Sequence, residues 1–235
     1  MNATLAIALL RQRLASPMRL LMLAAMWMPA VGFSVLTMSL GAVKGSGYFF
    51  ALVLAAGAIG QDVSSGVLQL TFARPVKRST YVLSRWFAAG AGGAVLGLLQ
   101  LAATALLLGA RGAWPGPLPL VSLALGDIVM AFTAAAVMVG LSSLVGGLGD
   151  LALFALATIS LQLASGVAGL RGWTMAHTLL DEAQRTLQPR VDFAWLAGQG
   201  APAWTDLVTA VSTTALFLLV AIVVLNRKEL SYAAD

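Results

Sequence analysis

The residues of this chain best suited to chemistry lie in a polar, basic segment between two apolar runs, GQDVSSGVLQLTFARPVKRSTYVLSR at residues 60–85. We call it the basic segment. Four of the fourteen Lys and Arg residues lie here, at Arg74, Lys77, Arg78 and Arg85. Guanidinium and ammonium groups donate charge-assisted hydrogen bonds to carboxylates and phosphates. The basic segment is therefore suited to contact with an acidic partner surface or with lipid phosphates.

Groups that could catalyse a reaction or bind a metal are scarce elsewhere. The chain has no cysteine, which excludes disulfides, thiolate metal sites and cysteine nucleophiles. Its single histidine, His177, excludes multi-histidine metal sites. The sequence also lacks the G-x-x-x-x-G-K-[ST] phosphate loop and the G-x-S-x-G elbow. We therefore expect no catalytic residue, no metal site and no cofactor bound by this chain, and no enzymatic activity of its own.

One acidic residue, Asp127, lies well inside an apolar run, about nine residues from its start and thus near mid-membrane. A carboxylate at that depth is costly and is usually either functional or paired. One interpretation is a contact with substrate or a proton site. The other is a hydrogen-bonded group that holds helices together, with Gln100 or Gln162 as its partner. The sequence leaves both interpretations open.

Composition indicates which elements must position these residues. Apolar residues make up 60% of the chain and charged residues only 10%, with a mean hydropathy of +0.91. A soluble protein of this size needs far more polar surface, so a polytopic membrane protein is expected. The net charge of +5 then reflects basic loops at a membrane surface rather than a nucleic-acid partner.

The predicted fold is all-α, a single transmembrane domain over residues 1–235. Because about 20 apolar residues cross a bilayer, the charge-poor runs predict six spans, at 20–43, 45–61, 80–110, 118–145, 150–170 and 205–226. Residues 1–18 predict a helix on the membrane surface, with Ile7, Leu10 and Leu14 on one face. Residues 171–204 form a long outer segment with a helical pattern at 174–187.

Two smaller patterns predict contacts between or along helices. Gly93 and Gly97 give the third span a face of small residues, which favours close helix packing. His177, Asp181 and Arg185 recur every four residues in the outer segment. That spacing predicts a stabilising ladder along one helix rather than a metal site.

The distribution of positive charge predicts the orientation. An even number of spans puts both termini on one side of the membrane. With both termini in the cytoplasm, the cytoplasmic segments carry nine Lys and Arg residues and the outer segments five. Basic residues prefer cytoplasmic loops, so this orientation is favoured. It places the basic segment in the cytoplasm, between the second and third spans.

The basic segment resembles the permeases of type-2 ABC transporters. The matching residues are Asp62, Gly66, Leu68, Leu70, Arg74, Pro75, Val76, Arg78, Tyr81 and Arg85. In that family the corresponding stretch, here residues 61–79, forms a coupling helix that docks on an ATP-hydrolysing subunit. The surface helix, the six spans, the long outer segment and the short basic tail also agree with that family.

The resemblance implies a multi-pass protein of the bacterial cytoplasmic (inner) membrane that exports a substrate. Its partners would be two copies of an ABC ATPase subunit, which bind ATP and magnesium, and a second permease copy, identical or similar to this one. The residues implied to contact the ATPase subunit are Asp62, Gly66, Leu68, Gln69, Arg74, Pro75, Arg78, Tyr81 and Arg85. Gln69 departs from the family, which commonly has a glutamate there, so an acidic contact would have to come from Asp62.

Other interpretations of the sequence remain open. The basic residues could instead anchor the loop at an anionic lipid surface. The chain could be an ion-coupled transporter or channel centred on Asp127, or a scaffold that docks a cytoplasmic protein without transport. The apolar spans favour an amphipathic or lipid-like cargo, or a mechanical action on a periplasmic partner.

Overall fold

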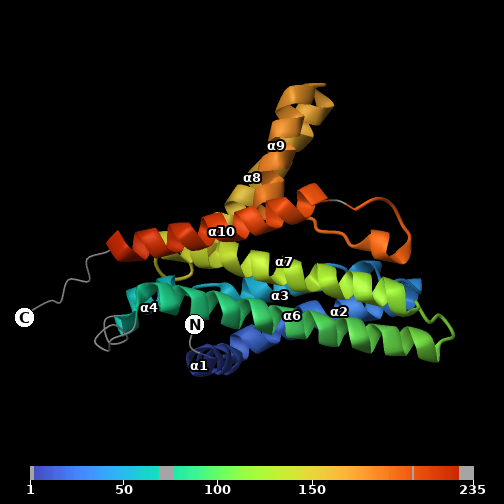
Figure 1. Ribbon diagram of the computed structural model, residues 1–235, viewed down its shortest axis with the longest axis horizontal. Helices are drawn as coiled ribbons and strands as arrows, with labels where there is room; N and C mark the ends of the chain where they lie inside the picture. The colour runs from blue at the N-terminus through green and yellow to red at the C-terminus, as the bar shows by residue number, and fades with distance from the viewer. Residues whose placement is uncertain (1–2, 69–76, 203, 228–235) are drawn as a thin grey trace, which may run out of the picture.

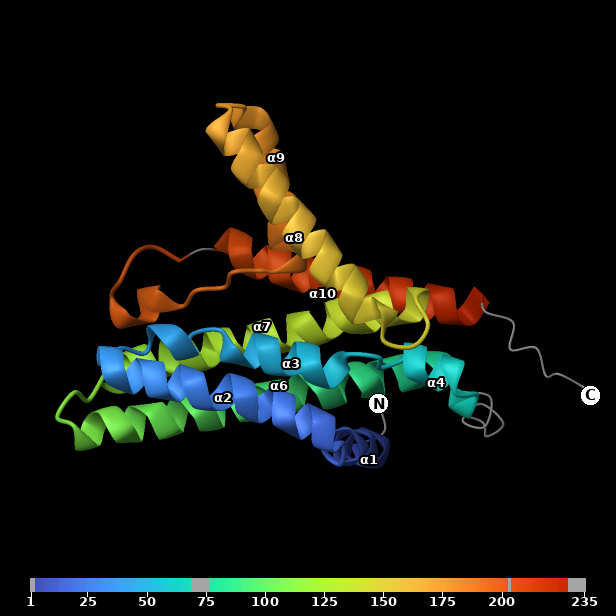
Figure 2. The ribbon, with the colours of Figure 1, turned by 180° about the vertical axis from the view of Figure 1, so that it is seen from behind.

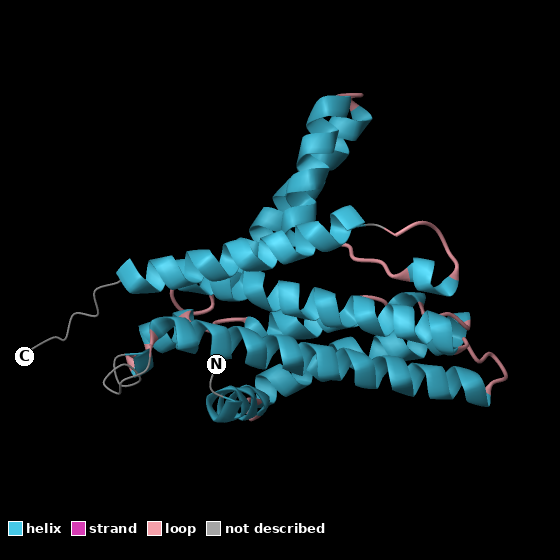
Figure 3. Cartoon of the chain, in the orientation of Figure 1, coloured by secondary structure: helices cyan, strands magenta, loops and turns pink. Residues whose placement is uncertain are grey.

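The computed structural model describes residues 3–68, 77–202 and 204–227, and every regular element within these ranges is a helix (Figures 1 and 3). In chain order they are α1 (Ala3–Leu14), α2 (Pro17–Thr37), η1 (Gly41–Val43), α3 (Ser46–Ala55), α4 (Gly60–Ser64), α6 (Arg78–Ala110), α7 (Pro117–Leu144), α8 (Gly149–Leu170), α9 (Thr174–Leu187), η2 (Ala194–Ala197) and α10 (Trp204–Arg227). The predicted all-α class is confirmed.

Six helical stretches are long and apolar enough to cross a membrane. They are Pro17–Thr37, Gly41–Ser64, Arg78–Ala110, Pro117–Leu144, Gly149–Leu170 and Trp204–Arg227. Six such stretches confirm the multi-pass prediction. The second one is interrupted, however, because α3 ends at Ala55 and α4 begins only at Gly60. Residues 3–14 are helical as predicted, and their position on a membrane surface stays a prediction.

The core lies where α3 packs between α6 and α7. Almost every side chain of α3 is buried, whereas α2 leaves most of its side chains exposed and only five residues of α10 are buried. Glycines make the close approach possible. A Cβ atom on Gly93 would lie 2.6 Å from Ala51 Cβ, and one on Gly97 would lie 2.9 Å from Gly47 Cα. Close packing at these two glycines is therefore confirmed, and the helix they pack against is α3.

The helical bundle has two distinct ends. Figures 1 and 2 show α1, α4, the turn between α7 and α8, and the last turn of α10 at one end, which we call the α4 end. The α6–α7 loop, η1 and η2 lie at the other. There Lys44 Nζ lies 2.6 Å from Asp192 Oδ2, and this hydrogen bond lowers the pKa of Asp192 below its usual value.

A hairpin of α8 and α9 projects from the side of the bundle (Figures 1 and 2). Its second helix covers the predicted residues, 174–187. Asp181 and Arg185 form the expected i,i+4 pair at 3.2 Å, but His177 Nδ1 lies 2.8 Å from Ser165 Oγ on α8. Of the predicted ladder, only the pair of Asp181 and Arg185 therefore forms along the helix. Among the described residues, no group of three His, Asp or Glu side chains could hold a metal ion.

Candidate functional site

The second span is broken at residues 56–59, just before the basic segment. The chain leaves the helix after Ala55 and turns at Gly57, which has a φ of 66°. A Cβ atom on Gly60 would lie 2.6 Å from Val145 O and 2.7 Å from Gly147 O, so α4 can begin here only with glycine. A break inside a membrane protein frees backbone donors and acceptors that other groups must satisfy.

The freed carbonyl oxygens accept hydrogen bonds from Arg13, a buried residue of α1. Its Nη1 lies 2.8 Å from Ala56 O and 3.1 Å from Gln61 Oε1, and its Nη2 lies 2.9 Å from Gly57 O. The planar guanidinium therefore covers adjacent carbonyls at once, a geometry that a lysine ammonium cannot reproduce. Burial, followed by repulsion from Arg19 and Arg85, lowers the pKa of Arg13 to about 10, so the group remains charged at neutral pH.

The freed N–H groups donate to side chains of α7 and α8. Gly57 N lies 2.6 Å from Asp150 Oδ2. Ser142 Oγ accepts from both Ile59 N and Gly60 N, at 3.0 and 2.9 Å. Asp150 and Ser142 are both fully buried. We call Arg13, Ser142 and Asp150 the break clamp, because they bind the same five-residue stretch, 56–60, from three different helices.

Three residues of the basic segment form a second buried cluster next to the break. The Asp62 carboxylate of α4 accepts hydrogen bonds from the Tyr81 hydroxyl and the Arg85 guanidinium of α6. Arg85 Nε also lies 3.2 Å from Tyr81 Oη. All three side chains are buried, with Arg85 only 5% exposed. They thus join α4 to α6 inside the molecule, and any effect on a partner would be indirect.

The other predicted contact residues lie in different surroundings. Leu68 is buried and belongs to the same apolar cluster as Tyr81. Gly66 has a φ of 71° and open space beside it. Arg78 Nη1 lies 3.1 Å from Asn226 O and also donates to Leu225 O, so it joins the start of α6 to the end of α10. Three further residues, Gln69, Arg74 and Pro75, lie outside the described residues.

Asp127 is hydrogen-bonded within the bundle. Its carboxylate accepts from Gly45 N at 2.8 Å and from Ser46 Oγ at 3.3 Å, at the first turn of α3. A carboxylate at a helix N-terminus accepts hydrogen bonds from free N–H groups and is stabilised by the positive end of the helix dipole. The two glutamines considered as partners lie elsewhere: Gln100 Nε2 donates to Trp27 O at 2.9 Å, and Gln162 is exposed on α8.

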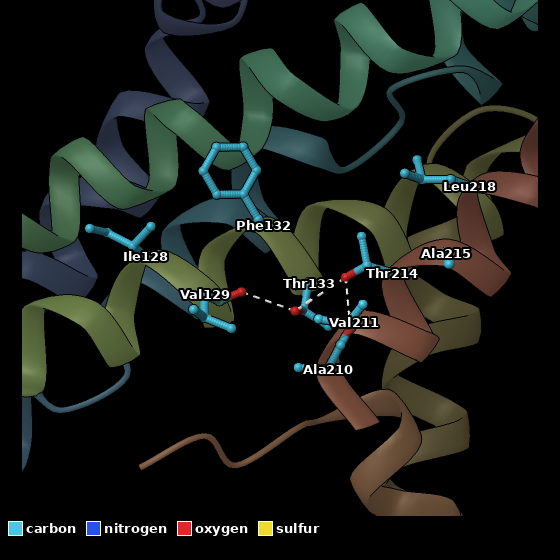
Figure 4. A pocket seen from close by; sticks show the side chains of 9 residues that line it. All are labelled: Ile128, Val129, Phe132, Thr133, Ala210, Val211, Thr214, Ala215 and Leu218. Carbon is cyan, nitrogen blue, oxygen red and sulfur yellow. Dashed lines mark hydrogen bonds between the residues drawn. The ribbon is translucent and has the colours of Figure 1, made fainter. Parts of the chain in front are cut away.

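An apolar groove between α7 and α10 is a second candidate site (Figure 4). It has a volume of about 440 Å³. Figure 4 shows its two hydroxyl groups, of Thr133 and Thr214, hydrogen-bonded to each other and to backbone carbonyls of their own helices. The remaining lining is almost entirely apolar. The groove can therefore hold an apolar group, but its lining offers no side chain suited to catalysis.

Sequence reasoning selected Asp62, Tyr81 and Arg85 as contacts to a partner, which stays a prediction, and it missed the break clamp. Gly57 and Gly60, inside an apolar run, were the only local signal of a broken helix. Arg13 lies outside the apolar face predicted for residues 1–18, yet only 7% of it is exposed. Comparisons with protein-family models, with curated proteins and with solved structures give no match for this chain.

Proposed function

We propose that this chain is the membrane-spanning permease subunit of an ATP-binding cassette exporter, driven by ATP that a separate subunit hydrolyses. The observation that carries the proposal is the way α4 is attached to α6 and separated from α3. The basic segment begins on α4, which Asp62, Tyr81 and Arg85 hold to α6 and which the break at 56–59 separates from α3. Together with the sequence resemblance, this arrangement suits a segment that transmits force.

The geometry supports α6 as the path of that force. This helix has 33 residues, about 50 Å at 1.5 Å per residue, whereas about 20 residues cross the hydrocarbon core. At least one end of α6 therefore extends beyond the core, and in this proposal it is the first turns, where a partner would push on them. A displacement of α4 and the start of α6 would pass along one continuous helix to α3 and α7, which pack against it.

The complete transporter in this proposal contains two such permease chains, identical or similar, and two ATPase subunits that bind ATP and magnesium. The α4 end would face the cytoplasm of a bacterium, with both chain termini on that side. Arg11, Arg13, Arg19, Lys77 and Arg78 all lie at this end, which supports that orientation. The permease itself would have no catalytic residue.

The surroundings of Asp127 favour this proposal over ion-coupled transport. Both hydrogen bonds of its carboxylate go to the first turn of α3, through Gly45 and Ser46. At the break, the carbonyls that could bind a cation in a discontinuous helix accept instead from Arg13. The charge of the guanidinium takes the place of an ion there. Both observations support structural roles for these groups.

The decisive experiment first asks whether the reading frame next to that of this chain encodes a P-loop ATPase, and then whether that ATPase binds this chain. The two proteins would be co-expressed, purified together in nanodiscs, and compared with complexes that carry Arg74→Ala or Lys77→Ala in the permease. Losing a charge-assisted contact should weaken docking and coupled ATP hydrolysis about tenfold. Arg111→Ala, an exposed arginine at the opposite end, is the matched control. Unchanged coupling in both variants, or an ATPase that never co-purifies, would overturn the proposal.

A further inference from the structure

A cavity of about 350 Å³ opens at the α4 end beside the break. Its walls come from the start of α2, from α3 and residues 56–61, and from the α7–α8 turn with the first turn of α8. The lining residues are Ser16, Met18, Arg19, Met22, Val53, Ala56, Gln61, Leu148 and Leu151. Five are apolar side chains larger than alanine, and one, Arg19, is charged. The cavity therefore combines an apolar wall with a single cation.

Arg19 has hydrogen-bonding capacity left over. Its Nη2 lies 2.9 Å from Gln61 Oε1 and 3.4 Å from Ala56 O. A guanidinium has five N–H donors in a planar fork. Within the described part of the chain, the structure gives no acceptor for Nε or Nη1 of Arg19. An oxygen of an anionic ligand could accept a hydrogen bond from either of these remaining donors.

The charges around the break leave a positive excess for such a ligand. Three guanidinium groups, those of Arg13, Arg19 and Arg85, lie close enough to repel one another. Two carboxylates oppose them: Asp62 is bonded to Arg85, and Asp150 accepts from Gly57 N. Three positive charges against two negative ones leave one positive charge. An anionic group beside Arg19 would neutralise it.

The position of the cavity along α2 indicates what kind of anion fits. Arg19 is the third residue of α2, whose apolar run begins at once with Leu20, so it lies where the first span enters the membrane. Arginines at span ends ordinarily extend toward water. Arg19 instead turns inward to Gln61, beside the apolar side chains of Met22 and Leu151. An anion attached to a hydrocarbon chain suits both parts of this wall.

We propose that this cavity binds the phosphodiester headgroup of an anionic membrane phospholipid through Arg19, with the acyl chains along Met22 and Leu151. The bound headgroup would lie against Ala56 and Gln61 and so stabilise the broken segment of the second span. This inference requires that the chain spans a membrane, and it is independent of the proposed ATPase partner. Its test therefore uses the full-length chain alone.

The experiment measures lipid binding to the delipidated chain in neutral detergent. Dioleoyl-phosphatidylglycerol is titrated against wild type, Arg19→Gln and Arg11→Gln, and bound lipids are counted by native mass spectrometry. Arg11 is exposed on α1 at the same end, so its variant removes the same charge without touching the cavity. We expect Arg19→Gln to bind phosphatidylglycerol about tenfold more weakly and Arg11→Gln to change the affinity less than twofold.

Two further measurements separate the possible outcomes. Phosphatidylglycerol should raise the melting temperature of wild type, through binding to the folded state, and phosphatidylcholine should not. Soluble glycerol 3-phosphate should not compete at the lipid's concentration. Equal losses in Arg19→Gln and Arg11→Gln, equal binding of phosphatidylcholine, or full competition by glycerol 3-phosphate would each overturn the proposal. If Arg19→Gln does not fold, Arg19→Lys, which keeps the charge but loses the fork, should bind more weakly than wild type; unchanged affinity would again contradict it.

Discussion

Arg13 and Asp150 bind the same short stretch of backbone from different helices, the first at carbonyl oxygens and the second at an N–H group. Neither contact could form if residues 56–59 continued the helix of α3, because those groups would then bond within the helix. The two side chains therefore replace the helical hydrogen bonds that the break removes. Buried polar groups tolerate such an exchange only when every partner is present.

At the residue scale, we predict that Arg13→Gln destabilises the fold by about 3 kcal/mol, since a glutamine cannot reach both Ala56 O and Gly57 O and leaves a buried acceptor unsatisfied. Thermal unfolding of the purified chain in detergent measures the loss. Arg11→Gln removes an exposed charge from the same helix and should change stability by no more than about 0.5 kcal/mol. Equal stability of the two variants would contradict the role assigned to Arg13.

At the element scale, the break divides the second span into two helices in different surroundings. α3 is buried between α6 and α7, while α4 is held to α6 by Asp62 and to the turn before α8 by the hydrogen bond from Gly147 N to Gly60 O, at 2.9 Å. Hinges between helices are a common means of domain and gate movement. In the proposed function, the division would let α4 follow the start of α6 while α3 stays in the core.

Close backbone packing at the start of α4 leads to a second prediction. Gly60→Ala would place a methyl group 2.6 Å from Val145 O, and backbone cannot move aside as a flexible side chain can. We expect a loss of about 1–3 kcal/mol in the free energy of unfolding, the usual cost of overpacking. Gly146→Ala is the matched control, because nothing lies within 4 Å of its added Cβ. A Gly60→Ala protein as stable as Gly146→Ala would show that α4 is not held against that turn.

At the scale of the whole molecule, the two ends of the bundle differ in what they carry. The α4 end combines α1, the break, α4, the start of α6 and the end of α10, and the other end carries η2, which lies between α9 and α10 (Figures 1 and 2). The proposed function requires the α4 end to face the cytoplasm, where an ATPase subunit would be found. This requirement can be tested without knowing the cargo.

We predict that Gln199→Cys reacts with a membrane-impermeant maleimide in intact cells and that Ser64→Cys reacts only after lysis. Both side chains are exposed, at opposite ends of the bundle, and the natural chain has no cysteine to interfere. The measurement is the fraction of each variant that is labelled. Labelling of Ser64→Cys in intact cells would place the basic segment outside and contradict docking to a cytoplasmic ATPase.

The sequence alone was enough for properties that depend on composition or on neighbours a few residues apart. The apolar runs predicted six helices long enough to span a membrane, a helical pattern predicted the helix at 174–187, and the small residues Gly93 and Gly97 predicted close packing. Each signal is local, because a helix satisfies its own backbone and its buried face shows in the residue spacing.

Only the tertiary structure decided which polar groups meet. Arg13 bonds a carbonyl 43 residues away, Asp150 accepts from an N–H group 93 residues away, and Asp127 bonds the start of α3 rather than either glutamine. No pattern of residue spacing in the sequence predicts these contacts between distant residues. A buried polar group bonds whichever partner the packing of helices brings within about 3 Å, and that packing depends on the whole bundle at once.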